Sequence, residues 1–183
     1  MSSPAVVVLA SGRGDRFTAS GGKGSKLQAL LGGRPVLERT LDAVRASGLP
    51  WHLEDAGHAG MGDSIAAGVR ATGDAQGWLI LPGDLPLVRP DSLQRVAAAL
   101  AGRAVVLPTF QGRQGHPVAF GPACRDALLL LSGPQGAALV ARAYKMTERA
   151  LQVELDDPGI VTDIDTVDDL ARAQAMLAGC APR

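Results

Sequence analysis

Short apolar runs that alternate with amphipathic segments are the feature that most constrains the fold of this chain. The run AVVVLAS at 5–11 is apolar and rich in β-branched residues, and WLIL at 78–81 and RAVVLPT at 103–109 are further apolar runs. Runs that are apolar on both faces are typical of strands buried in parallel sheets. After the first run, the segment 34–48 repeats apolar residues every three or four positions, which predicts a helix.

The rest of the chain continues this alternation. Further strands are expected at 51–54, 116–121, 150–156 and 159–165, and further helices at 63–71, 89–100, 122–133, 134–145 and 166–177. Gly48 is placed to end the first helix, and Thr166 to cap the last one, with Asp169 three residues on. The pattern predicts an α/β fold: a three-layer, Rossmann-like, mostly parallel sheet with helices on both faces.

Composition bounds the class of protein. The 183 residues suit one globular domain spanning 1–183. Eighteen basic residues balance eighteen acidic ones and only 3% of residues are aromatic, so neither a positive field nor stacking rings favour nucleic-acid binding. Cys124 and Cys180 have no metal-ligand spacing and are expected to be reduced thiols. No run is long enough to span a membrane, and no signal peptide is recognisable, which predicts a cytoplasmic protein.

The stretch LASGRGDRFTASGGKGSKLQALLGGRP at 9–35 is dense in glycine. A dinucleotide fingerprint needs G-x-G-x-x-G, but Phe17 stands where the third glycine should be. A P-loop needs a lysine followed by Ser or Thr, whereas Lys23 is followed by Gly24. Both motifs are therefore excluded.

What remains is a long glycine loop that carries Arg13, Arg16, Lys23 and Lys26. Glycines let backbone N–H groups approach an anion closely, and Arg and Lys neutralise its charge. These are the requirements of a triphosphate site. A flexible surface loop with solvated basic residues is the alternative that the loop alone leaves open.

Asp84 stands in LPGDLP, just beyond the apolar run 78–81. Ligands of α/β sheets bind beyond the carboxyl ends of the strands, so the loops that follow Leu9, Leu81 and Leu107 should share one edge. Mg²⁺ binds through one or two carboxylates together with substrate phosphates, which makes Asp84 a candidate metal ligand facing the glycine loop. The alternative is a turn aspartate that caps its own backbone.

Five blocks in one order resemble a known family. LASGRGDRF with a following lysine, GMGDSIAAGV, LPGDLPLV, GRQGHPVAFG and TDIDTVDDL are similar to the motifs of the molybdenum cofactor cytidylyltransferase and guanylyltransferase family. The resemblance extends over residues 5–178, and the cytidylyltransferase branch matches best. It implies a nucleotide-diphospho-sugar-transferase-like fold and Mg²⁺-dependent transfer of CMP from CTP to a molybdopterin-type cofactor, with release of pyrophosphate.

The resemblance also implies roles for individual residues. The nucleotide would be held by Ala10, Ser11, Gly12, Arg13, Gly14, Arg16, Lys26, Gly62 and Ser64. The catalytic set would be Arg16, Lys26 and Asp84, the metal ligands Asp84 and Asp165, and the acceptor-side residues Gln114, Gly115 and His116. Simple helix entry around Gly62, a cap-adjacent Asp165 and a structural His116 are the open alternatives.

Three features depart from the family pattern. The insertion TASGGKG leaves open whether Lys23 or Lys26 binds phosphate, although Lys26 fits better because the family places Lys-Leu shortly before the LGGRP turn. The stretch 48–60 is too short for the usual strand–helix–strand, so the sheet should be smaller by one unit and have an edge to cover. Ser11 has a side chain, as in the cytidylyl branch, which favours CTP over GTP.

Two other functions stay open. One is guanylyl or other nucleotidyl transfer to a different small phosphate. The other is a non-catalytic carrier or chaperone of molybdenum cofactor, which the shortened middle would suit. The expected partners are a nucleoside triphosphate, a molybdopterin-type cofactor, and a molybdoenzyme or its chaperone.

Overall fold

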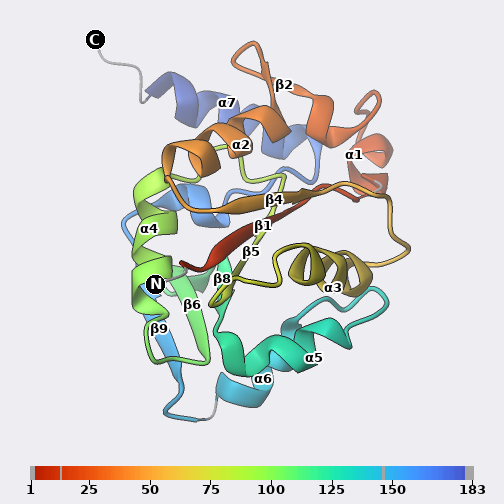
Figure 1. The fold of residues 1–183 in the computed structure, drawn as a ribbon. Helices are drawn as coiled ribbons and strands as arrows, with labels where there is room; N and C mark the ends of the chain where they lie inside the picture. Colours follow the sequence, from red (N-terminus) through yellow and green to blue (C-terminus); the bar gives the residue numbers. More distant parts are fainter. Residues whose placement is uncertain (1–2, 13, 146, 180–183) are drawn as a thin grey trace.

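The computed structural model describes residues 3–12, 14–145 and 147–179. A seven-stranded sheet crosses the molecule between two layers of helices (Figure 1). The strand order is β4-β1-β5-β8-β6-β7, and β9 also pairs with β6. The strands are β1 (Ala5–Leu9), β4 (Trp51–Glu54), β5 (Trp78–Pro82), β6 (Val105–Phe110), β7 (Arg113–Gln114), β8 (Val118–Phe120) and β9 (Ala150–Glu154). The predicted three-layer α/β fold is confirmed.

The sheet is mostly parallel. Strands β4 and β5 both run parallel to β1, and β9 runs parallel to β6. The short β8 lies antiparallel to both β5 and β6, so β6 has the same direction as β1. The carboxyl ends of β1, β5 and β6 therefore meet at one edge, as the sequence predicted.

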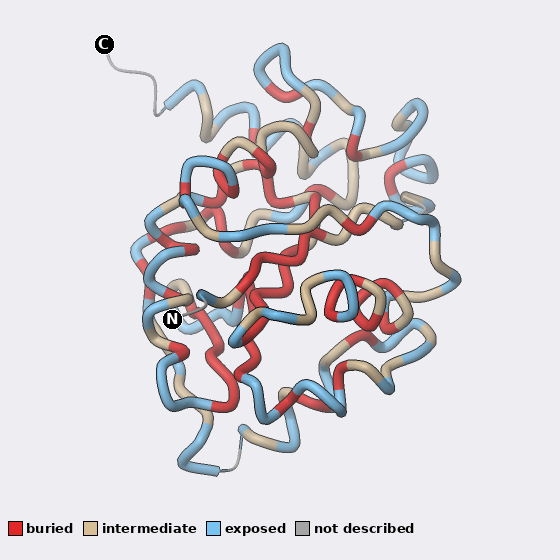
Figure 2. Tube along the Cα trace, viewed as in Figure 1, coloured by how far each residue is buried: buried red, intermediate tan, exposed pale blue. Residues whose placement is uncertain are grey.

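Successive side chains of β1 pack into two separate hydrophobic cores, one on each face of the sheet. Val6 and Val8 pack with one helix layer, whereas Val7 packs with the other, since successive residues of a strand point to opposite faces. The first layer contains α2 (Val36–Ala46) and α4 (Pro90–Ala99); the second contains α3 (Met61–Ala71), α5 (Arg125–Leu129) and α6 (Ala138–Lys145). Strands β1, β5, β6 and β8 form the buried centre of the molecule (Figure 2).

A third apolar cluster anchors the glycine-rich stretch. Phe17 on α1 (Asp15–Ala19) and Leu27 on the 3₁₀ turn η1 (Lys26–Gln28) pack with Leu31, Ile164 and Ala173. The remaining elements here are the hairpin β2 (Leu30–Leu31) and β3 (Arg34–Pro35) and the last helix α7 (Val167–Gly179). Helix α7 lies beside β2, so the first and last parts of the fold pack together (Figure 1).

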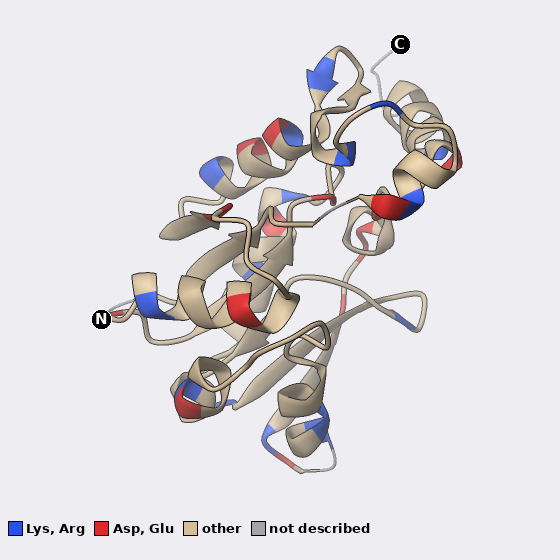
Figure 3. Cartoon of the chain, turned by 90° about the vertical axis from the view of Figure 1, so that its right-hand side faces the viewer, with Lys and Arg blue, Asp and Glu red and all other residues tan. Residues whose placement is uncertain are grey.

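Charged residues lie on the helices, the loops and the outer strands, and β1, β5, β6 and β8 carry none (Figure 3). Among the described residues, no helix combines the length and apolar character that crossing a bilayer requires.

Several helix ends follow the sequence signals. Gly48 has φ +69° directly after α2, a conformation that glycine adopts freely. Pro90 is the first residue of α4. At the start of α7, the Asp169 N–H donates to Thr166 Oγ1 (3.2 Å) and the Thr166 N–H donates to Asp169 Oδ2 (2.7 Å), which is a reciprocal cap.

Some predicted elements differ from the structure. The strand expected at 159–165 is wrong: a 3₁₀ turn, η3 (Pro158–Val161), stands there, because Pro158 has no N–H and the Asp157 side chain accepts from the Gly159 N–H. The segment 122–133 forms the 3₁₀ turn η2 (Pro122–Cys124) and then α5, which ends at Leu129. The four consecutive leucines at 128–131 show no helical periodicity, so the sequence does not indicate that the helix ends at Leu129.

Two helix starts were also missed. Helix α3 begins at Met61, two residues before the expected start, with Gly60 as a cap that has no side chain. Helix α1 was not predicted at all, because five residues are too few to show a helical period.

The short strand expected at 51–54 is confirmed, since β4 pairs directly with β1 from Val6↔Trp51 to Leu9↔Glu54. No other described strand pairs with the outer side of β4. Trp51 is 40% exposed on this edge, and the Arg45 guanidinium lies 5.7 Å from the centroid of its ring. A cation over an aromatic face contributes favourably and partly covers the edge.

Close packing of α3 on β1 yields a first prediction. A Cβ at Gly68 would lie 2.3 Å from Val7 Cγ1, and Val7 is fully buried and β-branched, so it cannot turn away. Gly68→Ala should lower the free energy of unfolding by about 1–3 kcal/mol in urea denaturation. Gly179→Ala is the control, because a Cβ there meets nothing within 4 Å. An unchanged Gly68→Ala variant would contradict the tight helix–strand contact.

Candidate nucleotide-binding site

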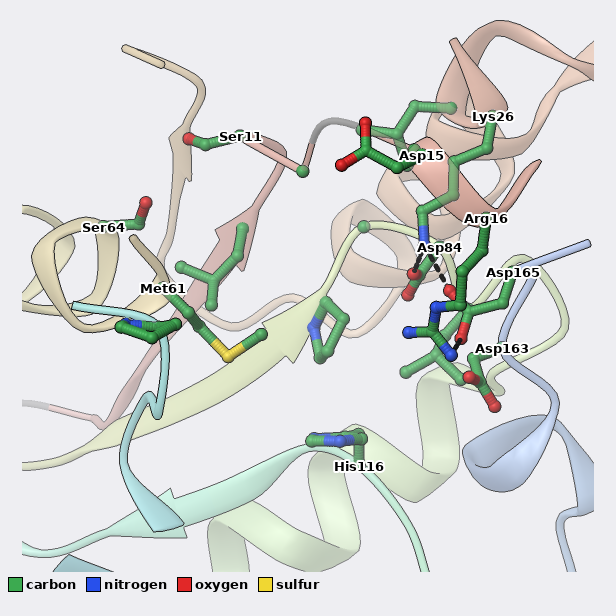
Figure 4. Close-up of a pocket in the computed structure, with 18 of the residues that line it drawn as sticks. Ser11, Asp15, Arg16, Lys26, Met61, Ser64, Asp84, His116, Asp163 and Asp165 are labelled. Carbon is green, nitrogen blue, oxygen red and sulfur yellow. Dashed lines mark hydrogen bonds and ion pairs between the residues drawn. The ribbon is translucent and has the colours of Figure 1, made fainter. Parts of the chain in front are cut away.

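A cleft of about 690 Å³ opens at the carboxyl edge of the sheet. It is walled by the loops after β1 and β5, the turn η1, the start of α3, the turn between β7 and β8, and the segment before α7. Eleven of the predicted site residues line it: Ser11, Gly12, Gly14, Arg16, Lys26, Ser64, Asp84, Gln114, Gly115, His116 and Asp165. The fold thus brings together residues from nearly the whole chain (Figure 4).

Two other predicted residues, Ala10 and Gly62, lie elsewhere. Ala10 packs against the third apolar cluster. Gly62 is buried, and its N–H donates to the Gly133 carbonyl (2.8 Å). A Cβ at Gly62 would lie 2.8 Å from the Ser132 backbone, so the close approach of the two chain segments explains this glycine. Arg13 lies outside the described residues.

Asp84 is fixed by the backbone on either side of it. The Gly83 N–H donates to the Leu9 carbonyl (2.9 Å), and the Gly83 carbonyl accepts from the buried Thr40 hydroxyl (2.9 Å). A Cβ at Gly83 would lie 2.9 Å from a methyl carbon of Leu37, so a residue without a side chain suits this close approach. The Asp84 carbonyl accepts from the Ile164 N–H (3.0 Å), which joins β5 to the segment before α7.

Lys26 bridges two carboxylates. Its Nζ lies 2.6 Å from Asp84 Oδ2 and 2.7 Å from Asp165 Oδ1, with all three side chains less than 20% exposed. Burial by itself lowers the pKa of Lys26, but the charges and hydrogen bonds of Asp84 and Asp165 outweigh it, so the pKa lies above its ordinary value. Lys26 is therefore a fixed positive charge at neutral pH.

Arg16 lies beside these three residues. Together, Arg16, Lys26, Asp84 and Asp165 form the charged end of the cleft. The Arg16 Nη1 lies 2.8 Å from Asp165 Oδ2, while 78% of the Arg16 side chain is exposed to solvent. Lys23, in contrast, forms no ion pair with any residue that the structure describes. Of the two candidate phosphate lysines, the structure brings Lys26 to the cleft.

Asp165 adjoins a helix cap, as one of its two expected roles requires, and it also lines the cleft. Its N–H donates to Asp169 Oδ2 (3.2 Å), so it adjoins the cap of α7. Its carboxylate binds both cations of the cluster. A residue of the helix cap is thereby also a member of the charged end.

Asp163 is a cleft residue that the sequence analysis missed. Burial raises its pKa, and the nearby charges of Asp165 and Asp84 raise it further. The spacing in the motif DID was the available signal, because residues i and i+2 of an extended segment point to the same side.

His116 also lines the cleft. In Figure 4 it lies below the other labelled side chains, between Ser64 on one side and Asp84 on the other. Burial lowers the pKa of His116, although the charges of Asp84 and Asp163 oppose this effect, so the ring is neutral at pH 7. Its Nδ1 is buried and has no hydrogen-bond partner among the described residues. Such an unsatisfied atom is costly unless a ligand pairs with it.

Within the described residues, no group of three or more His, Cys, Asp or Glu side chains is assembled to hold a metal ion. The carboxylate of Asp84 nevertheless has one buried oxygen, Oδ1, without a partner in the described part of the chain. The oxygens of Asp84 and Asp165 would therefore act together with oxygens supplied by a ligand, which is how Mg²⁺ is commonly bound.

Comparison with known proteins decides the family. Residues 42–151 match the description "MobA-like NTP transferase domain". The chain belongs to this family. It is also 30% identical to the 2-C-methyl-D-erythritol 4-phosphate cytidylyltransferase of Frankia casuarinae over an alignment that spans 97% of this chain and 82% of the relative. The predicted resemblance is confirmed, and with it the coarser function, a nucleotidyltransferase that takes a nucleoside triphosphate.

Solved structures share the fold. A nucleotidyl transferase from Methanothermobacter thermautotroptrophicus superposes with a TM-score of 0.81 at 25% identity, covering 98% of this chain and 99% of that one. A Mycobacterium tuberculosis protein solved with manganese has a TM-score of 0.72 at 22% identity, with 95% and 99% covered. Molybdopterin-guanine dinucleotide biosynthesis protein A of Archaeoglobus fulgidus has a TM-score of 0.66 at 17% identity, with 96% and 99% covered.

Removal of the bridging cation should be costly. In Lys26→Met, the carboxylates of Asp84 and Asp165 keep their charge but lose their shared partner. Thermal and urea unfolding at pH 7 should show a loss of about 2 kcal/mol. Lys23→Met is the matched control; an equal loss in both variants would contradict the assignment.

Proposed function

We propose that this protein transfers CMP from CTP to a molybdopterin-type molybdenum cofactor and releases pyrophosphate, with Mg²⁺ as the metal. The observation that carries the proposal is the Lys26 bridge between Asp84 and Asp165, in a cleft bordered by the glycine loop. Family membership and the motif resemblance support the reaction class. Ser11 supports CTP, since its side chain resembles the cytidylyl branch.

The cations of the charged end would bind the phosphates. Arg16 is mostly exposed and can turn from Asp165 toward a phosphate. Lys26 would exchange its two carboxylates for phosphate oxygens when the nucleotide enters. Gly12 and Gly14 line the same side of the cleft and let the backbone approach the nucleotide closely.

Asp84 and Asp165 fit a divalent metal ion. They offer carboxylate oxygens, the donors that Mg²⁺ prefers, and Asp84 Oδ1 is buried without a partner among the described residues. When bound, the metal would neutralise charge that develops on the phosphates. The manganese complex of the M. tuberculosis relative is consistent with such a site.

The acceptor would approach from the side of Gln114, Gly115 and His116, which line the cleft. His116 is held neutral by burial, and its unpartnered Nδ1 can hydrogen-bond a polar atom of the pterin or its phosphate. Gly115 cannot carry a side chain, since a Cβ would lie 2.4 Å from the Ile160 carbonyl oxygen. The acceptor would therefore contact the His116 ring, which is held on the closely packed turn at Gly115.

The reaction would be an in-line displacement. A phosphate oxygen of the acceptor forms a bond to the α-phosphorus of CTP while the bond between that phosphorus and the bridging oxygen of pyrophosphate breaks. A terminal phosphate is already ionised at neutral pH, so no general base is required. Such transfers depend mainly on positioning and charge neutralisation, which Arg16 and Lys26 supply.

A second candidate is cytidylyl transfer to another small phosphate. The Frankia relative, named for 2-C-methyl-D-erythritol 4-phosphate, favours it. The non-catalytic carrier has less support, because a protein that only carries the cofactor does not need the assembled Lys26, Asp84 and Asp165 cluster.

The direct test is pyrophosphate release. Purified protein with Mg²⁺ and molybdenum cofactor should release pyrophosphate with CTP, and less with GTP. Replacing the cofactor by 2-C-methyl-D-erythritol 4-phosphate distinguishes the second candidate. Absence of pyrophosphate with both nucleotides and both acceptors would contradict the proposal.

Asp84 should be required for the chemistry. Asp84→Asn removes the negative charge with little change in shape, so turnover should fall by about 100-fold or more. Asp156→Asn serves as the control because Asp156 is exposed and does not line the cleft. If Asp84→Asn retained full turnover with Mg²⁺, the metal role would be wrong.

A further inference from the structure

A second polar cluster lies beside the cleft, away from the charged end. The Glu54 carboxylate accepts from the rings of two histidines: its Oε2 lies 3.2 Å from His52 Nε2 and its Oε1 lies 3.0 Å from His58 Nε2. The Ala56 N–H also donates to Oε1 (3.3 Å). Only 6% of Glu54 is exposed, so its carboxylate is held in place from several sides.

This cluster is hydrogen-bonded to the start of the glycine loop through the backbone of Glu54. The Glu54 carbonyl accepts from the Ala10 N–H (2.9 Å) and from the Ser11 hydroxyl (3.3 Å). Both contacts exist because β4 pairs directly with β1, which places Glu54 opposite Leu9. The direct pairing of β4 with β1 therefore puts the end of β4 at the cleft.

The two histidines share one partner but differ in position. Their side chains are almost equally exposed, 32% for His52 and 31% for His58. His58 lines the cleft, whereas His52 lies within the edge strand β4 and does not. His52 is therefore an internal control for any purely structural role of the cluster.

The charge state of Glu54 fixes the hydrogen on each ring. Burial alone would raise its pKa, but hydrogen bonds from His52, Ala56 and His58 lower it below the ordinary value. An ionised carboxylate only accepts hydrogen bonds, so the hydrogen of His58 is on Nε2. In the neutral ring, Nδ1 is then an acceptor.

The cleft has two ends of different character. Arg16, Lys26, Asp84 and Asp165 gather at one end, and Ser11 and Ser64 lie at the other (Figure 4). A triphosphate at the charged end directs the nucleoside toward Ser11. His58 lines the cleft next to Gly60, the cap of the helix that carries Ser64, and so belongs to the nucleoside end.

We propose that His58, oriented by Glu54, is a specificity-determining residue that recognises the nucleobase and favours CTP over UTP. The inference rests on the proposed function for the direction of the nucleotide in the cleft. Cytosine has an exocyclic amine that can donate to an acceptor nitrogen, where uracil has a carbonyl oxygen that cannot. A site that presents a fixed acceptor discriminates by leaving the wrong base unpaired.

The test compares binding of CTP, UTP and inorganic tripolyphosphate by calorimetry with Mg²⁺. Wild-type protein should bind CTP more tightly than UTP. In His58→Ala, CTP affinity should fall about tenfold and the CTP-to-UTP ratio should approach one, as expected for loss of one oriented hydrogen bond. Tripolyphosphate has no base, so its affinity should not change.

Two further variants separate recognition from structure. Glu54→Gln leaves His58 in place but removes the charge that fixes its hydrogen, so the CTP-to-UTP ratio should fall there too. His52→Ala should keep the wild-type ratio. An unchanged ratio in His58→Ala, or an equal fall in His52→Ala, would overturn the inference. Wild-type protein that binds neither tripolyphosphate nor CTP would overturn the proposed function as well.

Discussion

The ammonium of Lys26, held between the carboxylates of Asp84 and Asp165, is the interaction on which the cleft depends. Lys26 is 58 residues from Asp84 and 139 residues from Asp165 in the chain, so one side chain joins the glycine loop, the middle of the sheet and the segment before α7. The charges are mostly buried, and neither carboxylate would be stable there without a cation. A ligand that takes Lys26 must therefore supply a replacement for both carboxylates. A nucleoside triphosphate that binds together with a divalent metal meets this requirement: its phosphates would pair with Lys26, and the metal would pair with the carboxylates.

The direct pairing of β4 with β1 determines which residues line the other end of the cleft. Because β4 is both the edge strand and the neighbour of β1, its last residue, Glu54, lies against the loop that begins at Ala10. The segment that follows β4 then carries His58 to the cleft, at the end opposite Arg16 and Lys26.

The sequence predicted the layers and the edge of the sheet at which the cleft opens, because buried strands and amphipathic helices carry strong periodic signals. It placed Asp84 and Lys26 in the same cleft through their positions after strands and through the resemblance to a family. It missed Asp163, although the spacing in DID carried a signal, and it missed His58 and Glu54, whose positions depend on which strand lies beside β1. The strand expected at 159–165 failed because an aspartate side chain and a proline close a turn there, and such local hydrogen bonds override an apolar pattern.

The measurement that tests the account most directly is the affinity of Mn²⁺ for the protein with and without CTP, followed by electron paramagnetic resonance of the free ion. Lys26 occupies the carboxylates when no nucleotide is present, so Mn²⁺ should bind weakly alone. CTP should raise the affinity at least about tenfold beyond that of Mn²⁺ for CTP in solution, because binding of the two ligands is coupled through one cluster. A Mn²⁺ affinity in the presence of protein and CTP that is no higher than that of CTP alone would contradict the account.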